Sequence, residues 1–178
     1  VRLDPASGAA LRLGGTVFSV SPDGRWAASP SLRRTAVTQR GYGVVVPRRY
    51  VPENRDAPVD DGIWLTDLDS GESRLLVSIA HLVEQAGPAL AGVRGGRGDW
   101  FGFHVKWNPQ GTRLMFVLRW LPRSWLQWKR KNRHGAKQVL TMDADGGDIR
   151  VAVSAERWAR GGHHPNWCPD GEHVLMNL

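Results

Sequence analysis

Two histidines stand at the same place in a repeated sequence, and their chemistry is the first feature to explain. His104 and His164 each lie five residues before a turn proline, and His163 lies beside the second of them. A neutral imidazole on a rigid scaffold is a ligand for Zn²⁺ or Mn²⁺ and also a general base near neutral pH. No HExxH or CxxC motif accompanies them. Three roles therefore stay open for His104, His163 and His164: metal ligand, catalytic base, and a plain hydrogen-bonding group at the start of a strand.

A segment rich in tryptophan and basic residues could bind an extended anion. It covers residues 121–136 and contains Trp125, Trp128 and Arg130. Indole faces stack on sugars or bases, and guanidinium groups hold anions. The chain carries 24 Lys and Arg against 17 Asp and Glu, a formal net charge of +7, which favours acidic partners. We expect contact with an acidic polysaccharide or oligosaccharide rather than nucleic acid. The alternatives are an anionic membrane surface or a solvated loop whose tryptophans cover the core.

The elements that position these side chains follow from a pattern that occurs three times, at residues 18–31, 104–120 and 164–178. In each copy a short strand reaches a turn with proline and glycine two residues apart, and a strand with apolar residues follows. Proline presets φ to about −65° and glycine accepts a positive φ, so the turn is tight. The pattern therefore predicts serial repeats of β-structure.

Two further hairpins follow the first two repeats. Residues 62–77 turn at Asp67–Gly71, and residues 137–154 turn at Asp143–Gly147. Each repeat and its hairpin make a unit of four antiparallel strands, and such units in series are typical of a β-propeller. Apolar residues at helical spacing predict one short helix over 78–91.

We predict an all-β fold with about two and a half propeller blades of four antiparallel strands each. Residues 1–15 end a blade, and residues 16–91 form a blade with a long surface loop over 31–61. Residues 92–99 are a Gly/Arg loop, residues 100–154 form the next blade, and residues 163–178 begin another. Such a chain is part of a larger propeller or closes by self-association, because an edge strand would otherwise be exposed. No run of 18 apolar residues occurs, so no transmembrane span is expected.

These motifs resemble Tol-type (TolB-like) propeller repeats, in which a strand ends in Trp-Ser-Pro-Asp-Gly and a later one in Asp-x-Asp-Gly-Gly. The matching segments are 18–24, 63–71, 104–111, 140–147 and 164–171. The chain also resembles bacterial propellers related to oligogalacturonate lyases and ulvan lyases, through Gly41–Gly43, Asp60–Leu65 and His104–Gly111, in this order. That resemblance implies a polysaccharide-lyase-like protein with a histidine-bound metal. Where those relatives have His-Trp-Phe-Asn, this chain has Asp99-Trp100-Phe101-Gly102.

A lyase that eliminates across a uronic acid needs three groups. A cation neutralises the carboxylate, a base removes the α-proton, and an acid protonates the leaving oxygen. Arg40, His104 and Tyr42 could supply these roles in that order. The alternative for Tyr42 is a Gly-Tyr-Gly turn whose ring packs on the surface.

Three functional hypotheses follow. The chain is a propeller lyase or degenerate relative that acts on a uronate-containing glycan, a non-enzymatic binding propeller for a glycan or protein, or a structural fragment. The single cysteine, Cys168, excludes an internal disulfide and leaves the compartment open. No secretory signal begins the chain; as part of a longer bacterial precursor it would be periplasmic or secreted.

Overall fold

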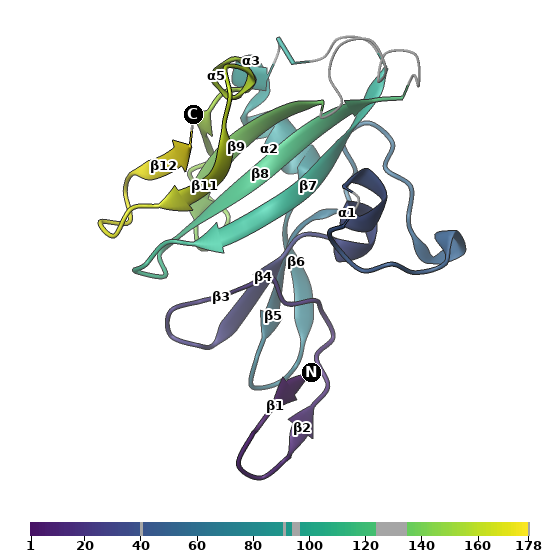
Figure 1. Ribbon diagram of the computed structural model, residues 1–178, viewed down its shortest axis with the longest axis vertical. Coiled ribbons are helices and arrows are strands. Elements are labelled where there is room, and N and C mark those ends of the chain that lie inside the picture. Colours follow the sequence, from purple (N-terminus) through teal and green to yellow (C-terminus); the bar gives the residue numbers. More distant parts are fainter. Residues whose placement is uncertain (40, 91, 94–96, 124–134, 178) are drawn as a thin grey trace.

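The computed structural model describes residues 1–39, 41–90, 92–93, 97–123 and 135–177, which are built mainly of antiparallel strands (Figure 1). The strands are β1 (Arg2–Leu3), β2 (Ala10–Leu11), β3 (Ser19–Val20), β4 (Trp26–Ser29), β5 (Gly62–Asp67), β6 (Ser73–Ser78), β7 (Gly98–Trp107), β8 (Arg113–Pro122), β9 (Ala136–Asp143), β10 (Arg150–Val153), β11 (His163–Trp167) and β12 (Val174–Asn177). They form two four-stranded sheets, β3-β4-β5-β6 and β7-β8-β9-β10, and two pairs, β1-β2 and β11-β12. The expected all-β class and the two four-stranded units are confirmed.

The three predicted Pro-x-Gly turns have the same backbone structure. In each, the glycine amide donates to the carbonyl oxygen three residues earlier, at 2.8 to 3.0 Å. The pairs are Gly24 with Ser21, Gly111 with Asn108, and Gly171 with Cys168. The three glycines have φ values of 73°, 71° and 74°, which favour a residue without Cβ. Local turn chemistry therefore fixes the repeat.

The two four-stranded sheets pack against each other through one continuous core. Alternate side chains of strand β8 point to opposite faces of the β7–β10 sheet, so they pack against different neighbours. Phe116 and its neighbours at i±2 join Ile63 of β5 in the main core. Met115 faces the other way and packs with Val139 and Trp167, toward the β11-β12 pair. One face of the β7–β10 sheet is therefore covered by the first sheet, and part of the other face is covered by the β11-β12 pair.

Helices occupy the connections. They are α1 (Leu32–Thr38), the 3₁₀ turn η1 (Arg48–Tyr50), α2 (Ile79–Gln85), α3 (Gly87–Leu90) and α5 (Ala155–Ala159). The helix expected over 78–91 is present as α2 followed by α3. The segment 31–61, expected to be a loop, contains α1 and η1 instead. Helix α1 escaped prediction because its buried side is polar, consisting of Arg34 and Thr35, so it shows no apolar period.

A buried polar network joins α1 to both large sheets. The Arg34 guanidinium donates to both carboxylate oxygens of Asp60, at 3.0 and 3.1 Å, and lies 3.6 Å from Asp61. The Asn54 amide donates to the carbonyl oxygen of Trp100 in β7 and to Asp61. Burial raises the pKa of Asp61 despite the nearby Arg34. Charge and hydrogen bonds thus attach the polar segment 31–61, in addition to the apolar packing of Val51 and Ala57.

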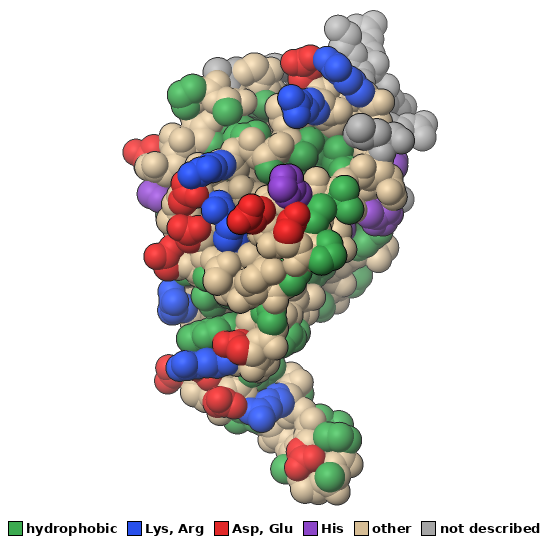
Figure 2. All heavy atoms as spheres, turned by 90° about the vertical axis from the view of Figure 1, so that its left-hand side faces the viewer, with side chains coloured by type: hydrophobic (Ala, Val, Ile, Leu, Met, Phe, Trp, Pro, Cys, Tyr) green, Lys and Arg blue, Asp and Glu red, His purple; other side chains and the backbone are tan. Residues whose placement is uncertain are grey.

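The described sheets do not form a closed ring, and the β1-β2 hairpin projects at one end of the molecule (Figure 1). The β11-β12 pair lies along the opposite side of the β7–β10 sheet from α1. Seen from that side, acidic and basic side chains are interspersed over the surface (Figure 2). In the described ranges no helix has the length and apolar character needed to cross a membrane.

Candidate functional site

The candidate site lies on the face of β7, β8 and β9 that points away from the main core. Phe101 of β7 is paired with Arg119 of β8, and Arg119 with Lys137 of β9. Paired residues share a face of the sheet, so Arg119 and Lys137 both lie on this face. Leu118, the neighbour of Arg119 in β8, points to the opposite face. A break in register between Gly102 and Val105 interrupts the β7 ladder. Such bulges re-aim side chains and are frequent next to active sites.

Four aromatic rings meet at this bulge. His104 stacks on Phe103 with centroids 3.9 Å apart and an interplanar angle of 20°. Phe18, just before β3, lies 5.2 Å from the His104 ring. The Tyr42 ring centroid lies 6.1 Å from that of His104 and 5.2 Å from that of Phe103, which Tyr42 meets edge-on. We call Phe18, Tyr42, Phe103 and His104 the aromatic cluster. The fold thus brings together two predicted catalytic residues, Tyr42 and His104, from distant parts of the chain.

The electrostatic surroundings keep His104 neutral. Burial is the main cause, followed by the nearby charges of Lys106, His164 and Arg119, and together they lower its pKa to about 4. At neutral pH the imidazole therefore has a free lone pair and can accept a proton or a hydrogen bond. Tyr42 is 45% exposed, so solvent and ligands can reach the cluster beside it.

Three cations lie on the same sheet as the aromatic cluster, and of these Arg119 contacts a member of the cluster. Arg119 is 1% exposed, donates to Gln39 Oε1 at 3.0 Å and lies over the Phe103 ring at 5.2 Å. Burial lowers its pKa to about 10, so it stays charged at neutral pH. Burial also lowers the pKa of Lys106 and of Lys137, the latter with help from Arg119. Clustered, partly desolvated cations favour a bound anion.

The other predicted histidines lie nearby but do not form a cluster of ligands. His163 and His164 are exposed, and their rings are 6.2 Å apart. His164 has a φ of 55°, so its backbone departs from the regular strand. No three His, Cys, Asp or Glu side chains within the described ranges gather closely enough to hold a metal ion. The zinc or manganese expectation stays a prediction, and no chemical step below depends on it.

Four predicted residues, Arg40, Trp125, Trp128 and Arg130, lie outside the described residues, so their roles stay predictions.

The sequence did give a signal for one residue that was not predicted. Arg119 interrupts the apolar run that begins at Leu114, and an arginine inside a buried strand requires partners. Where the lyase-like motif has His and Asn, the structure gives other reasons for the residues present. Asp99 accepts hydrogen bonds from Arg123 at 2.5 to 3.0 Å. A Cβ on Gly102 would lie 2.4 Å from the Phe116 ring, so only glycine fits there.

Comparison with known proteins finds no matching family model, no matching curated protein and no matching solved structure.

Proposed function

We propose that the chain is part of a β-propeller that binds a uronate-containing acidic glycan at the aromatic cluster, with β-elimination as its reaction. The observation that carries the proposal is that the Tyr42 ring lies beside the His104 ring, with their centroids 6.1 Å apart. Beside it, burial keeps His104 neutral, and Arg119 stays charged. A neutral base, a phenol and a positive surrounding are the groups that elimination next to a carboxylate requires.

The propeller interpretation is supported by how the sheets repeat. The two four-stranded sheets have the same strand order, and the same Pro-x-Gly turn joins the two strands of the β11-β12 pair. The first strand of the central sheet, β7, contacts the first strands of its neighbours, β3 and β11. In a propeller, the first strands of successive blades lie next to one another around the axis.

The proposed reaction uses the two side chains as base and acid. His104 accepts the proton from the carbon next to the carboxylate, and the electron pair of that C–H bond forms a double bond to the neighbouring carbon. The bond from that carbon to the glycosidic oxygen breaks, and the Tyr42 hydroxyl protonates the leaving oxygen. The guanidinium of Arg119, which lies over the Phe103 ring of the aromatic cluster, supplies the positive charge beside the charge that develops on the carboxylate.

The test measures elimination directly. Incubation with ulvan or pectin-derived oligomers should release an unsaturated uronyl product that absorbs in the near ultraviolet. His104→Gln and Tyr42→Phe should abolish this absorbance, whereas Tyr50→Phe, which changes a second exposed tyrosine, should not. Glycan retention without product would overturn elimination and leave a binding propeller. Neither retention nor product would overturn the whole proposal.

Two subsidiary predictions concern the expected metal and the basic segment. Elemental analysis should detect zinc or manganese if the histidines bind it, and its absence would end that role for His104, His163 and His164. Trp125→Ala and Arg130→Ala should weaken glycan retention if residues 121–136 bind the polymer.

A further inference from the structure

A cavity of about 260 Å³ lies between the start of β9, α5 and the start of β11. Three large side chains line it: Lys137 of β9, Trp158 of α5 and His163 of β11. The other described lining residues are glycines and alanines, which leave room in front of the larger side chains. No member of the aromatic cluster lines this cavity, so the proposed elimination does not use it.

The cation and the indole of this wall contact each other. The Lys137 ammonium lies over the Trp158 ring, 5.6 Å from its centroid. Trp158 is half-buried and packs against Met115, Val139 and Trp167, which form the second apolar cluster. This packing holds the indole in place while part of it faces the cavity. A fixed aromatic surface and an ammonium group therefore meet in one space.

Lys137 is a cation without a carboxylate partner among the described residues. No Asp or Glu within the described ranges lines the cavity, and Lys137 forms no ion pair there. Its neighbour across the strands is a second cation, Arg119. Burial and the charge of Arg119 together lower the pKa of Lys137. Two like charges on one face repel each other, and a bound anion would offset that repulsion.

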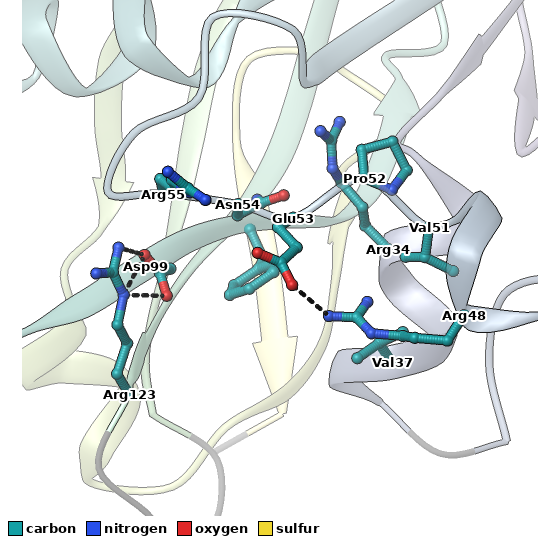
Figure 3. A pocket seen from close by; sticks show the side chains of 11 residues that line it. Arg34, Val37, Arg48, Val51, Pro52, Glu53, Asn54, Arg55, Asp99 and Arg123 are labelled. Atoms are coloured by element: carbon teal, nitrogen blue, oxygen red, sulfur yellow. Dashed lines mark hydrogen bonds and ion pairs between the residues drawn. The ribbon is translucent and has the colours of Figure 1, made fainter.

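The larger cavity on the other side of α1 shows the contrast. Arginines line it, and carboxylates accompany two of them (Figure 3). Arg123 donates hydrogen bonds to Asp99, and Arg48 lies 3.7 Å from Glu53. An anion that entered that cavity would compete with these carboxylates. At Lys137 no carboxylate of the described residues would compete.

We propose that the cavity at Lys137 is a second sugar subsite, which holds one acidic unit of the glycan with its carboxylate at Lys137 and its ring against Trp158. The inference rests on the proposed function, because this unit belongs to the same glycan as the unit at the aromatic cluster. The two places are neighbours on one face, since Lys137 is paired with Arg119 and Arg119 lies over the Phe103 ring. The volume lies below the range of cavities for drug-sized ligands and suits a single sugar unit.

The experiment titrates the chain with trigalacturonate and with its methyl-esterified counterpart, which has the same rings without the charges. Tyr42→Phe serves as the background, because the proposed elimination would otherwise consume the probe. NMR follows the indole N–H resonance of Trp158 and the backbone amide resonance of Phe103. The charged oligomer should shift both resonances, and the esterified oligomer should bind about tenfold more weakly or less.

Three further variants in this background test the role of the ammonium group. Lys137→Gln should weaken the binding of trigalacturonate about tenfold, because a hydrogen bond to a charged group contributes roughly that factor. Lys137→Arg keeps a positive charge at this place and should keep most of the affinity. Arg74→Gln removes an exposed arginine of β6 and should leave the affinity unchanged.

The outcomes separate this subsite from the elimination site. A shift of the Phe103 resonance without a shift of the Trp158 resonance would overturn the subsite and leave the proposed function standing. Equal affinity with and without Lys137→Gln would do the same. A Trp158 shift that depends on Lys137, together with no unsaturated product from the unsubstituted chain, would support the subsite and overturn elimination alone. No shift at either place would overturn both proposals.

Discussion

The two four-stranded sheets share one strand order but differ greatly in the length of their first two strands. In the first sheet β3 has 2 residues and β4 has 4. In the second sheet β7 and β8 have 10 residues each. In both sheets the same Pro-x-Gly turn joins the first two strands. The extra length of β7 and β8 therefore lies at the ends of these strands that are away from the turn.

That extra length carries the candidate chemistry. His104 and Arg119 lie on the added part of β7 and β8, together with the bulge that aims His104. The first sheet contributes Phe18, just before β3, and its connection between β4 and β5 contributes Tyr42, which follows α1. The shared unit therefore builds the core, whereas the extensions and insertions of that unit build the candidate site. Such a division is expected of repeat folds, whose functions lie in grafted sites.

The largest expected effect tests whether the long strands hold the core. Phe116→Ala removes a fully buried ring of β8 and should lower the free energy of unfolding by about 3–5 kcal/mol. Val20→Ala, on the short β3 where the side chain is 47% exposed, should change it by about 0.5 kcal/mol or less. Urea denaturation with an unchanged m-value measures both. Equal losses would show that the two sheets contribute alike.

The next effect concerns the attachment of α1 to both sheets. Arg34→Leu leaves the buried Asp61 without its cation and should cost about 3 kcal/mol at pH 7. Because burial already raises the pKa of Asp61, loss of Arg34 should raise it further. The carboxyl is then more readily protonated, so the cost should shrink as the pH falls below 7.

Arg33→Leu is the matched control, since Arg33 is a neighbour on the same helix with one exposed hydrogen bond to the Tyr50 carbonyl. It should cost about 1 kcal/mol or less at any pH. A loss for Arg34→Leu that is small, or that grows in acid, would contradict a charged buried attachment.

A smaller effect follows from the neutral state of His104. Its folded pKa of about 4 lies below the ordinary histidine value of 6.5, so the unfolded chain binds the proton more tightly. The stability contributed by the neutral imidazole is complete above pH 6.5 and is lost as the pH falls through 4. After allowance for solvent screening we expect a loss of about 1–2 kcal/mol over this range.

His104→Gln should remove this part of the acid sensitivity, and His81→Gln, which changes an exposed histidine of α2, should keep it. Thermal melts between pH 4 and 7 compare the three proteins. The same acid loss in wild type and His104→Gln would assign the sensitivity to other groups.

Local signals explain which parts of the fold were predicted from the sequence. The Pro-x-Gly turns and the Asp/Gly hairpins need particular residues at particular positions, so the turns and the four-stranded units followed from them. The start of β7 did not, because Gly98 and Asp99 end the Gly/Arg segment 92–99, which was wrongly predicted to be a loop throughout. Helix α1 did not, because charges rather than apolar residues attach it to the sheets.

The candidate site was predicted only in part, for a similar reason. Resemblance and residue type singled out Tyr42 and His104, and the structure places them in contact. Phe18 and Phe103 reach them through a sheet-to-sheet contact and a bulge. Neither feature can be obtained from sequence spacing, because both depend on how two sheets pack.

The smallest expected effect on stability separates chemistry from packing in the aromatic cluster. Tyr42→Phe removes one hydroxyl from a side chain that is 45% exposed and keeps the ring that meets Phe103. The free energy of unfolding should therefore change by about 0.5 kcal/mol or less. Loss of a general acid typically costs about 100-fold or more in rate, so release of the unsaturated product should fall by that factor. Unchanged product release would show that Tyr42 only packs against the bulge, and the extended strands would then carry a structural cluster rather than a site.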